Sequence, residues 1–231
     1  MEAATSDSAV ETLARMHYFF DTAFPTGAYA HSFGFESFAV GGGPVTVEGT
    51  ARWIREFAAF ALWPADLEVI SRTLEAGWAG VESGALLAID RRLHASRSTA
   101  EGRLAATRLA ASIRSAASQA YRDLHLPEEV GLLREPASAV GVVAMALGWP
   151  ALQTRLLYLV SQVVSLASVP VRHGRLGQSG QLQVVEILTA DCAKLAVERP
   201  GGAQPAAPAF NWTIEGDQIR HVALSPRLYQ S

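Results

Sequence analysis

The sequence predicts an all-α fold: a single helical-bundle-like domain of about eight to ten helices with a flexible C-terminal tail. Apolar residues recur at spacings of three and four along most of the chain, which is typical of amphipathic helices. Prolines stand at the first turns and ends of those stretches. Alternation of Val, Ile and Thr with a period of two, which would indicate strands, is nearly absent. A chain of 231 residues with 49% hydrophobic residues is long enough for one sizeable core.

The helices are expected in the following order. The first clear amphipathic stretch begins at Thr46 and should end at Pro64, because proline lacks the N–H that a helix interior requires. Asp66 can join the start of the next helix. A long helix over residues 109–124 should be closed by Pro127. Further helices are expected over residues 82–94, 136–147, 150–168 and 179–197.

A change of composition near the C-terminus divides the chain. Residues 1–199 form the predicted helical domain, residues 200–208 are a Pro/Gly/Ala linker, and residues 209–231 are a polar tail. Because a linker of this composition does not pack, the tail is expected to behave as an appendage.

The composition excludes several classes of protein. With 19 Lys and Arg against 22 Asp and Glu, the net charge of −3 creates no strong overall field for nucleic acid or an anionic membrane. The single lysine, Lys194, lies outside any Gly-rich turn, so there is no Gly-Lys-Ser/Thr phosphate loop. The single cysteine, Cys192, excludes an internal disulfide and is expected to be a small buried hydrophobe.

Neither a secretory signal nor a membrane span is predicted. The first twenty residues begin acidic and polar, which is the reverse of a secretory signal. The most apolar run, residues 156–171, contains polar side chains and falls short of the ~20 apolar residues of a membrane span. We therefore expect a soluble, cytoplasmic protein.

The sequence predicts no catalytic residue, no metal site within one chain and no stably bound cofactor. No two histidines are three to five residues apart, although a nickel site with one histidine from each of two chains stays open. Residues 177–180 miss the Gly-x-Ser-x-Gly spacing of a nucleophile elbow by one position. A small helical enzyme with His31 and Glu36 as acid and base is an alternative without an identifiable substrate. The histidines are His17, His31, His94, His125, His173 and His221.

Clustered arginines suggest a second alternative function. Six arginines lie between Asp90 and Arg114, against two carboxylates, Asp90 and Glu101. Such a basic face could bind phosphates as a helical nucleic-acid-binding module. It lacks helix-turn-helix spacing and interleaved aromatic residues, so a solvated face or one that meets an acidic protein is favoured. The six are Arg91, Arg92, Arg97, Arg103, Arg108 and Arg114.

Two glycine-containing loops interrupt the helical pattern. In the first, Pro25 and Gly27 set a rigid turn, and Gly34 follows at the start of a helix. This glycine indicates either close helix packing or an approach of the backbone to a ligand or partner. The second loop could bind an anion through backbone N–H groups or form a helix junction. Its glycines stand at every third position, Gly174, Gly177 and Gly180.

These loops carry a resemblance to a known family. Residues 21–36, Asp-Thr-Ala-Phe-Pro-Thr-Gly-Ala-Tyr-Ala-His-Ser-Phe-Gly-Phe-Glu, closely resemble the N-terminal signature of the UreF family of urease accessory proteins. Residues 175–181, Arg-Leu-Gly-Gln-Ser-Gly-Gln, look like its Pro-Leu-Gly-Gln-x-x-Gly-Gln element. Residues 219–231 resemble its Arg-His-x-x-Leu-x-x-Arg-Leu-Phe-x-Ser ending. The three motifs follow in the family's order and together span residues 21–231.

The resemblance implies a non-enzymatic, chaperone-like role in nickel insertion into urease. UreF-like proteins are all-α dimers that sit between the GTPase UreG and the scaffold protein UreD, also called UreH. They help to deliver nickel to apo-urease and are thought to control GTP hydrolysis by UreG. Nickel would then be the delivered metal, and GTP would belong to the partner.

Carried onto this chain, the resemblance assigns partner-binding residues to all three motifs. Arg172 would take the place of a basic residue often found before the second motif, and the tail would fold onto UreD when it binds. Three positions depart from the family: Arg175 replaces a proline, Phe35 a leucine and Tyr229 a phenylalanine. The implied partner-binding residues are Phe24, Pro25, Gly27, Tyr29, His31, Ser32, Gly34, Glu36, Arg172, Arg175, Gly177, Gln178, Gln181, His221, Leu224, Arg227, Leu228 and Tyr229.

Overall fold

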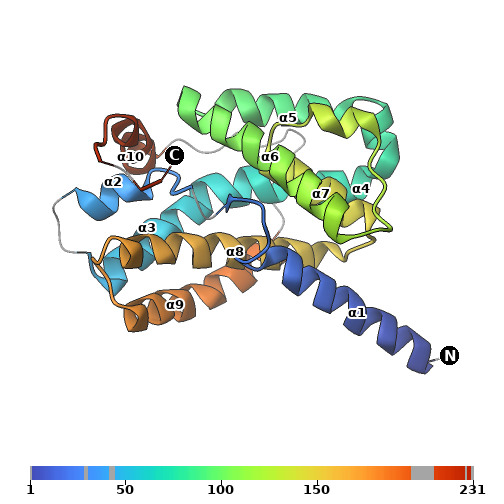
Figure 1. Cartoon of the computed structure of the whole chain (residues 1–231), viewed down its shortest axis with the longest axis horizontal. Helices are drawn as coiled ribbons and strands as arrows, with labels where there is room; N and C mark the ends of the chain where they lie inside the picture. The colour runs from blue at the N-terminus through green and yellow to red at the C-terminus, as the bar shows by residue number, and fades with distance from the viewer. Residues whose placement is uncertain (1, 29–30, 42–44, 199–210, 227, 230–231) are drawn as a thin grey trace.

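The computed structural model describes residues 2–28, 31–41, 45–198, 211–226 and 228–229, and over these residues the chain is helical with no strand (Figure 1). The all-α prediction is therefore confirmed. The α-helices are α1 (Glu2–Phe20), α2 (Phe35–Val40), α3 (Val47–Phe57), α4 (Glu68–Glu82), α5 (Ala85–Ser96), α6 (Ala100–Ala120), α7 (Pro136–Ala146), α8 (Ala151–Arg172), α9 (Gln178–Val197) and α10 (Trp212–Val222). A π-helix (Ala58–Leu67) joins α3 to α4, and a 3₁₀ helix (Glu128–Leu132) precedes α7.

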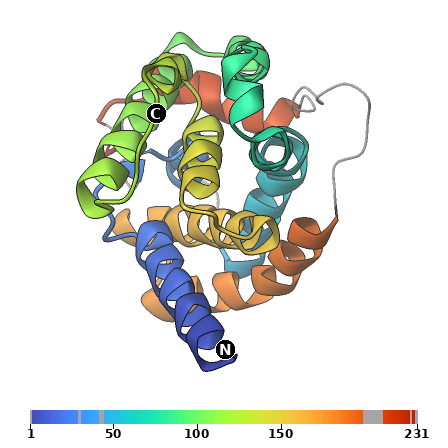
Figure 2. The same cartoon turned by 90° about the vertical axis from the view of Figure 1, so that its right-hand side faces the viewer.

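Helix α8 is the central element of the domain. It packs against α9 along its length and also contacts α1, α2, α3 and α4. Figures 1 and 2 show it between α9 on one side and the α5–α7 group on the other. By length and composition α8 could cross a membrane, but it is a packed core helix, and core helices of soluble proteins pass the same test. Its composition is therefore explained by the core that it forms.

Helix α1 projects from the body of the domain, which Figures 1 and 2 both show. Its C-terminal end is held by the Arg15 guanidinium, which donates to Asp123 at 2.9 Å, and by the Tyr121 hydroxyl, which donates to the Arg15 carbonyl at 2.9 Å. The Phe19 ring lies 5.1 Å from that of Trp149, between centroids. The sequence pattern did not indicate this helix, because, from Ser8 to its end, it buries apolar residues only in its last turns.

Pro64 does not end a helix, and the prediction of a break there was wrong. Pro64 lies inside the π-helix, and the chain continues from α3 through it into α4. The wider turn of a π-helix accommodates a residue that cannot donate the i→i−4 hydrogen bond. The consequence is that Asp66 lies within the continuous helical path, where it is buried.

The prediction of a flexible C-terminal tail was also wrong for the residues that the structure describes. Helix α10 packs against α2, and the Ile214, Asp217, His221 and Tyr229 side chains are buried. Two of the partners that hold this segment, Trp53 and Glu36, lie more than 160 positions away in sequence, so local composition could not reveal them. The linker at residues 200–208 lies outside the described residues.

Candidate functional site

The first motif bends the chain sharply so that a second helix can approach. Phe33 and Gly34 both have positive φ, of 52° and 87°, immediately before α2. A Cβ atom on Gly34 would lie 2.6 Å from the backbone nitrogen of Gln218 in α10. Only a glycine permits both this conformation and this contact. Gly34, for which the sequence predicted a close approach of the backbone, therefore lies in close contact with the C-terminal helix.

The Glu36 carboxylate is the centre of the site. It is 1% exposed and accepts hydrogen bonds from the His221 ring Nε2 at 2.8 Å, the Leu228 backbone N–H at 2.7 Å and the Tyr229 backbone N–H at 3.2 Å. His173 Nε2 lies 3.1 Å from Glu36 Oε1, the oxygen that accepts from Leu228, without the alignment of a hydrogen bond. A buried carboxylate is stable only with such donors. One side chain of α2 thus fixes the last residues of the chain.

The residues just before the second motif reach the same place at the end of α8. The Arg172 guanidinium donates to the Tyr229 hydroxyl at 3.1 Å and lies 5.5 Å from the centre of that ring. The His173 ring lies 6.0 Å from it, between centroids. The hydroxyl that distinguishes Tyr229 from the family's phenylalanine therefore has a partner. We call Glu36, Arg172, His173, His221, Leu228 and Tyr229 the Glu36 junction.

Two further contacts hold α10 on the body. The Trp53 indole N–H donates to the Asp217 carboxylate at 2.8 Å, and both side chains are buried. Arg220 pairs with the other oxygen of that carboxylate. His221 also faces α6, where its Nδ1 lies 3.5 Å from the Glu101 carboxylate. The C-terminal helix is consequently attached to α2, α3 and α6 by polar contacts.

The structure brings together part of the predicted site. Gly34 and Glu36 of the first motif, Arg172 beside the second, and His221, Leu228 and Tyr229 of the third meet at or beside the Glu36 junction. Tyr29 and Arg227 lie outside the described residues.

The other predicted residues lie apart from the junction or contribute in other ways. Phe24 is buried in a ring cluster, 5.0 Å from Phe19 between centroids. His31 and Ser32 are buried in the turn that leads to Gly34. Pro25 and Gly27 are exposed on their loop, and Arg175 and Gly177 are exposed on the turn between α8 and α9. Gln178 is exposed at the first position of α9, while Gln181 and Leu224 are half-buried.

Sequence reasoning missed His173, Trp53 and Asp217. His173 stands directly beside Arg172, but it has no second histidine at metal-ligand spacing and lies outside the residues of the three motifs. A pairing between Trp53 and Asp217 has no local signal, because the two are 164 positions apart. A buried tryptophan N–H always needs an acceptor, and this need is the only clue that the sequence offers.

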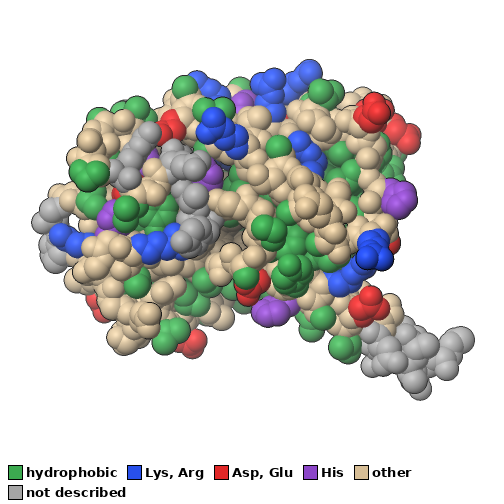
Figure 3. Space-filling view, viewed as in Figure 1, with side chains coloured by type: hydrophobic (Ala, Val, Ile, Leu, Met, Phe, Trp, Pro, Cys, Tyr) green, Lys and Arg blue, Asp and Glu red, His purple; other side chains and the backbone are tan. Residues whose placement is uncertain are grey.

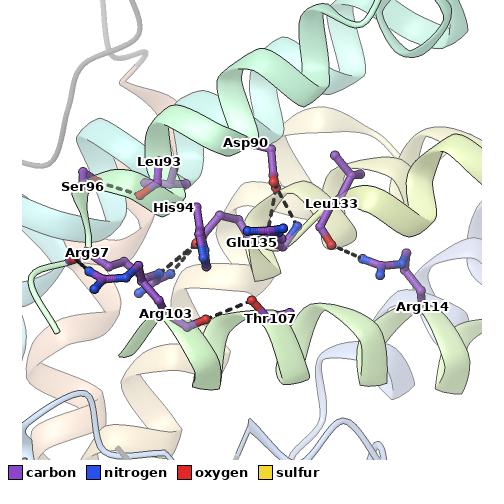
Figure 4. A network of polar contacts seen from close by, with 11 residues as sticks. Asp90, Leu93, His94, Ser96, Arg97, Arg103, Thr107, Arg114, Leu133 and Glu135 are labelled. Carbon is purple, nitrogen blue, oxygen red and sulfur yellow. Dashed lines mark hydrogen bonds and ion pairs between the residues drawn. The ribbon is translucent and has the colours of Figure 1, made fainter. Parts of the chain in front are cut away.

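Half of the arginine cluster is structural rather than exposed. Arg97 donates three hydrogen bonds to the two oxygens of the Glu135 carboxylate, which is fully buried and also contacts His94 Nδ1 at 2.8 Å (Figure 4). Arg103 donates to the Arg97 carbonyl at 2.6 Å, and Arg114 to the Leu133 carbonyl at 2.9 Å. These three arginines join α5 and α6 to the segment before α7. They weaken the nucleic-acid alternative, because these three arginines of the cluster already have partners within the domain.

The geometry also argues against the acid–base pair of the enzyme alternative. Burial, together with the positive charges of Arg108 and Arg97, lowers the pKa of His31. The described contacts of Glu36 go to the C-terminal segment and to His173, and none joins it to His31. Within the part of the chain that the structure describes, no three His, Cys, Asp or Glu side chains are grouped to hold a metal ion.

Comparison with known proteins then identifies the family. The UreF family model matches residues 45–188, which is more than half of the chain. The chain belongs to the UreF family. The UreF assignment is supported over about nine-tenths of the chain, since the chain is similar to proteins named urease accessory protein UreF from three bacteria. These are from Paenarthrobacter aurescens strain TC1 (29% identity, 91% of this chain and 94% of the relative), Arthrobacter sp. strain FB24 (29%, 91% and 93%) and Cereibacter sphaeroides (28%, 90% and 93%).

The region matched by the family model contains only part of the Glu36 junction. The matched region of the UreF model ends at residue 188, before α10, and begins after α2. The Glu36 junction joins one residue before that region, two residues within it and the C-terminal segment after it. The UreF fold of this chain therefore includes the last described residues as a packed part of the domain, in a protein of the urease maturation system.

Proposed function

We propose that this chain is a non-catalytic urease maturation factor that bridges UreG and UreD (UreH) on apo-urease and modulates GTP-dependent nickel delivery. It would act as a homodimer in the cytoplasm, as a chaperone of the urease apoprotein. Nickel is the cargo of the assembly, and GTP is bound by UreG. The chain itself would contribute surfaces rather than a catalytic group or a resident cofactor.

The observation that carries this proposal is the position of Leu228. Its backbone N–H is fixed by Glu36 at 2.7 Å, while its side chain is 65% exposed. An apolar side chain held outward on a docked backbone is already ordered for binding, so a partner that contacts it would lose little conformational freedom in the complex. We therefore assign Leu228 as the tail's contact with UreD, with His221 and Tyr229 as the anchors that hold it in place.

The exposed turn between α8 and α9 supports a second contact. Arg172 is bound to the tail through Tyr229, Arg175 lies exposed on the turn, and Gln178 lies exposed at the first position of α9. A partner that binds this turn would therefore lie next to the tail, and its binding would depend on whether the tail is docked. We propose that UreG binds here, next to UreD.

The test is reconstitution with purified partners. Size-exclusion chromatography with light scattering is run on the chain alone, then with UreD, and then with UreD and GTP-loaded UreG. The native chain should elute as a dimer and shift into complexes with UreD and with both partners. Leu228→Asp should lose the UreD complex and nickel-dependent activation of urease, because it places a charge in an apolar contact.

The matched control is Leu182→Asp, on α9. Leu182 is 72% exposed, so this variant adds the same charge to an equally exposed leucine. Both variants should keep the circular dichroism spectrum and Tm of the native chain. Equal UreD affinity for the Leu228 variant and the native chain would reject the tail assignment, and failure of the native chain to bind either partner would reject the proposed function.

A further inference from the structure

Two carboxylates around α5 and α6, Asp90 and Glu135, are buried, whereas several nearby arginines are exposed. Of the other carboxylates, Glu101 on α6 is half-buried beside His221, and Glu128 and Glu129 are exposed on the 3₁₀ helix before α7. Asp90 is fully buried and accepts the backbone N–H groups of Arg134 and Glu135 at 2.9 and 3.0 Å. Glu135 is also fully buried and holds Arg97 and His94. These two carboxylates consequently neutralise no charge at the surface.

Four arginines of this region remain at the surface. Arg91 and Arg92 on α5, Arg108 on α6 and Arg134 before α7 are exposed, and no ion pair between described residues involves them. We call these four the arginine face. Figure 3 shows positively charged side chains gathered over α5 and α6, with acidic side chains mainly toward the ends of that area. The chain as a whole is negative, with a net charge of −3, so this face is opposite in sign.

Two exposed leucines lie on the same elements. Leu104 is 51% exposed and stands one helical turn before Arg108 on α6. Leu132 is 60% exposed and stands two residues before Arg134. Leucines add nothing to phosphate binding, whereas arginine next to apolar side chains is typical of protein interfaces. The mixture favours a protein over a nucleic acid.

We propose that the arginine face binds an acidic surface patch on a protein partner of urease maturation. Guanidinium groups keep their charge at every physiological pH and bind carboxylates through paired hydrogen bonds. The face is built from α5, α6 and the segment before α7, whereas the Glu36 junction is built from α2, α8 and the C-terminal segment. It is therefore a second surface, and the inference rests on the proposed function for the identity of its partner.

The test reverses the charge of the face in the full-length chain. The triple variant Arg91→Glu, Arg92→Glu, Arg108→Glu replaces helix-forming residues by others of similar propensity, so the fold should persist. Binding of UreD, UreG and apo-urease, each added alone, is measured by biolayer interferometry at 50 and 300 mM NaCl. The control variant, Arg52→Glu, Arg122→Glu, Lys194→Glu, makes the same change of charge at exposed positions on α3, after α6 and on α9.

We expect the face variant to lose at least about tenfold in affinity for one of the three proteins at 50 mM NaCl, mainly through slower association. The remaining binding should depend less on salt. A milder variant with Gln at the three positions should lie in between. The control variant should bind all three proteins as the native chain does, and each variant is used only after its Tm matches the native value.

Three results would overturn the inference. The first is unchanged affinity of the face variant for all three proteins while the native chain binds them, which leaves the proposed function intact. The second is that a 20-bp DNA duplex binds the native chain but not the face variant, while both chains bind the three proteins equally well. The third is a homodimer that dissociates only in the face variant, with no change in partner binding, which would assign the face to a second copy. If the native chain binds none of the proteins, the proposed function fails and this inference with it.

Discussion

Glu36 and His221 are 185 positions apart in sequence, yet their side chains meet at 2.8 Å and each is 1% exposed. The pair joins α2, near the start of the chain, to the end of α10, near the end of the chain. Because the same carboxylate also accepts the backbone N–H groups of Leu228 and Tyr229, it determines the position of the segment that we propose to meet UreD. The fold and the proposed contact with UreD thus depend on the same side chain.

Replacement of Glu36 by Gln should release the C-terminal segment. The amide puts an N–H group where the backbone N–H groups and the His221 ring require acceptors, and breaking such a buried pair costs about 3 kcal/mol. Hydrogen exchange of residues 212–229 should rise strongly, and urea unfolding should show reduced stability. The control Glu186→Gln, at an exposed position on α9, should change neither. Native protection in the Glu36 variant would show that the junction is not what holds the tail.

Replacement of Gly34 by Ala should separate α10 from α2. The new Cβ would lie 2.6 Å from the Gln218 backbone nitrogen, so one of the two backbones must move. Gly27→Ala is a matched control, because Gly27 also has a positive φ, of 77°, but has open space around it. Both variants should lose about 1 kcal/mol from the backbone conformation. Only the Gly34 variant should lose more in thermal unfolding and expose residues 212–222 to limited proteolysis. Equal losses would contradict the close approach.

Stability should depend on pH through Asp66. Its carboxylate is buried and accepts the Tyr158 hydroxyl at 2.5 Å, and burial raises its pKa from 3.8 to about 6. The native state therefore holds this proton up to about pH 6, whereas the unfolded chain releases it near pH 3.8. The resulting stabilisation is complete below pH 3.8 and is lost as the pH rises through about 6.

The variant Asp66→Asn isolates this effect. The amide oxygen can still accept from Tyr158 but has no proton to lose, so the pH-dependent loss of about 3 kcal/mol at most should disappear. Urea unfolding at pH 4.5 and pH 8 should show that the variant's stability relative to the native chain rises between the two. Parallel pH profiles would mean that Asp66 titrates normally in the native state.

Removal of the Arg97 side chain should destabilise the domain by about 3 kcal/mol. Arg97→Ala leaves the fully buried Glu135 carboxylate with His94 as its remaining side-chain partner. Arg92→Ala, on the exposed face of α5, should change stability by no more than about 0.5 kcal/mol. Chemical unfolding of the two variants measures this contrast between structural and exposed arginines. Similar small effects would place Arg97 with the exposed group.

The sequence by itself determined the helical class and the positions of several helices. The helix expected over residues 109–124 is an exception, because α6 runs from Ala100 to Ala120 and ends well before Pro127. Helices α7, α8 and α9 begin within two residues of where the first-turn prolines and apolar spacing predict. Periodicity is a local property, so it survives without knowledge of the fold. The three motifs were also recognisable in sequence, and with them the family, because they are short runs of particular residues.

Only the tertiary structure decided what the motifs do. A π-helix carries the chain through Pro64, and a glycine at residue 34 admits the backbone of α10. The polar tail, which composition marked as an appendage, is held by Glu36 and Trp53 through hydrogen bonds that span more than 160 residues. Such pairings depend on which surfaces the folded chain brings together. Local helix propensity does not predict them, because the packing of the folded chain determines which group lies next to a buried polar side chain.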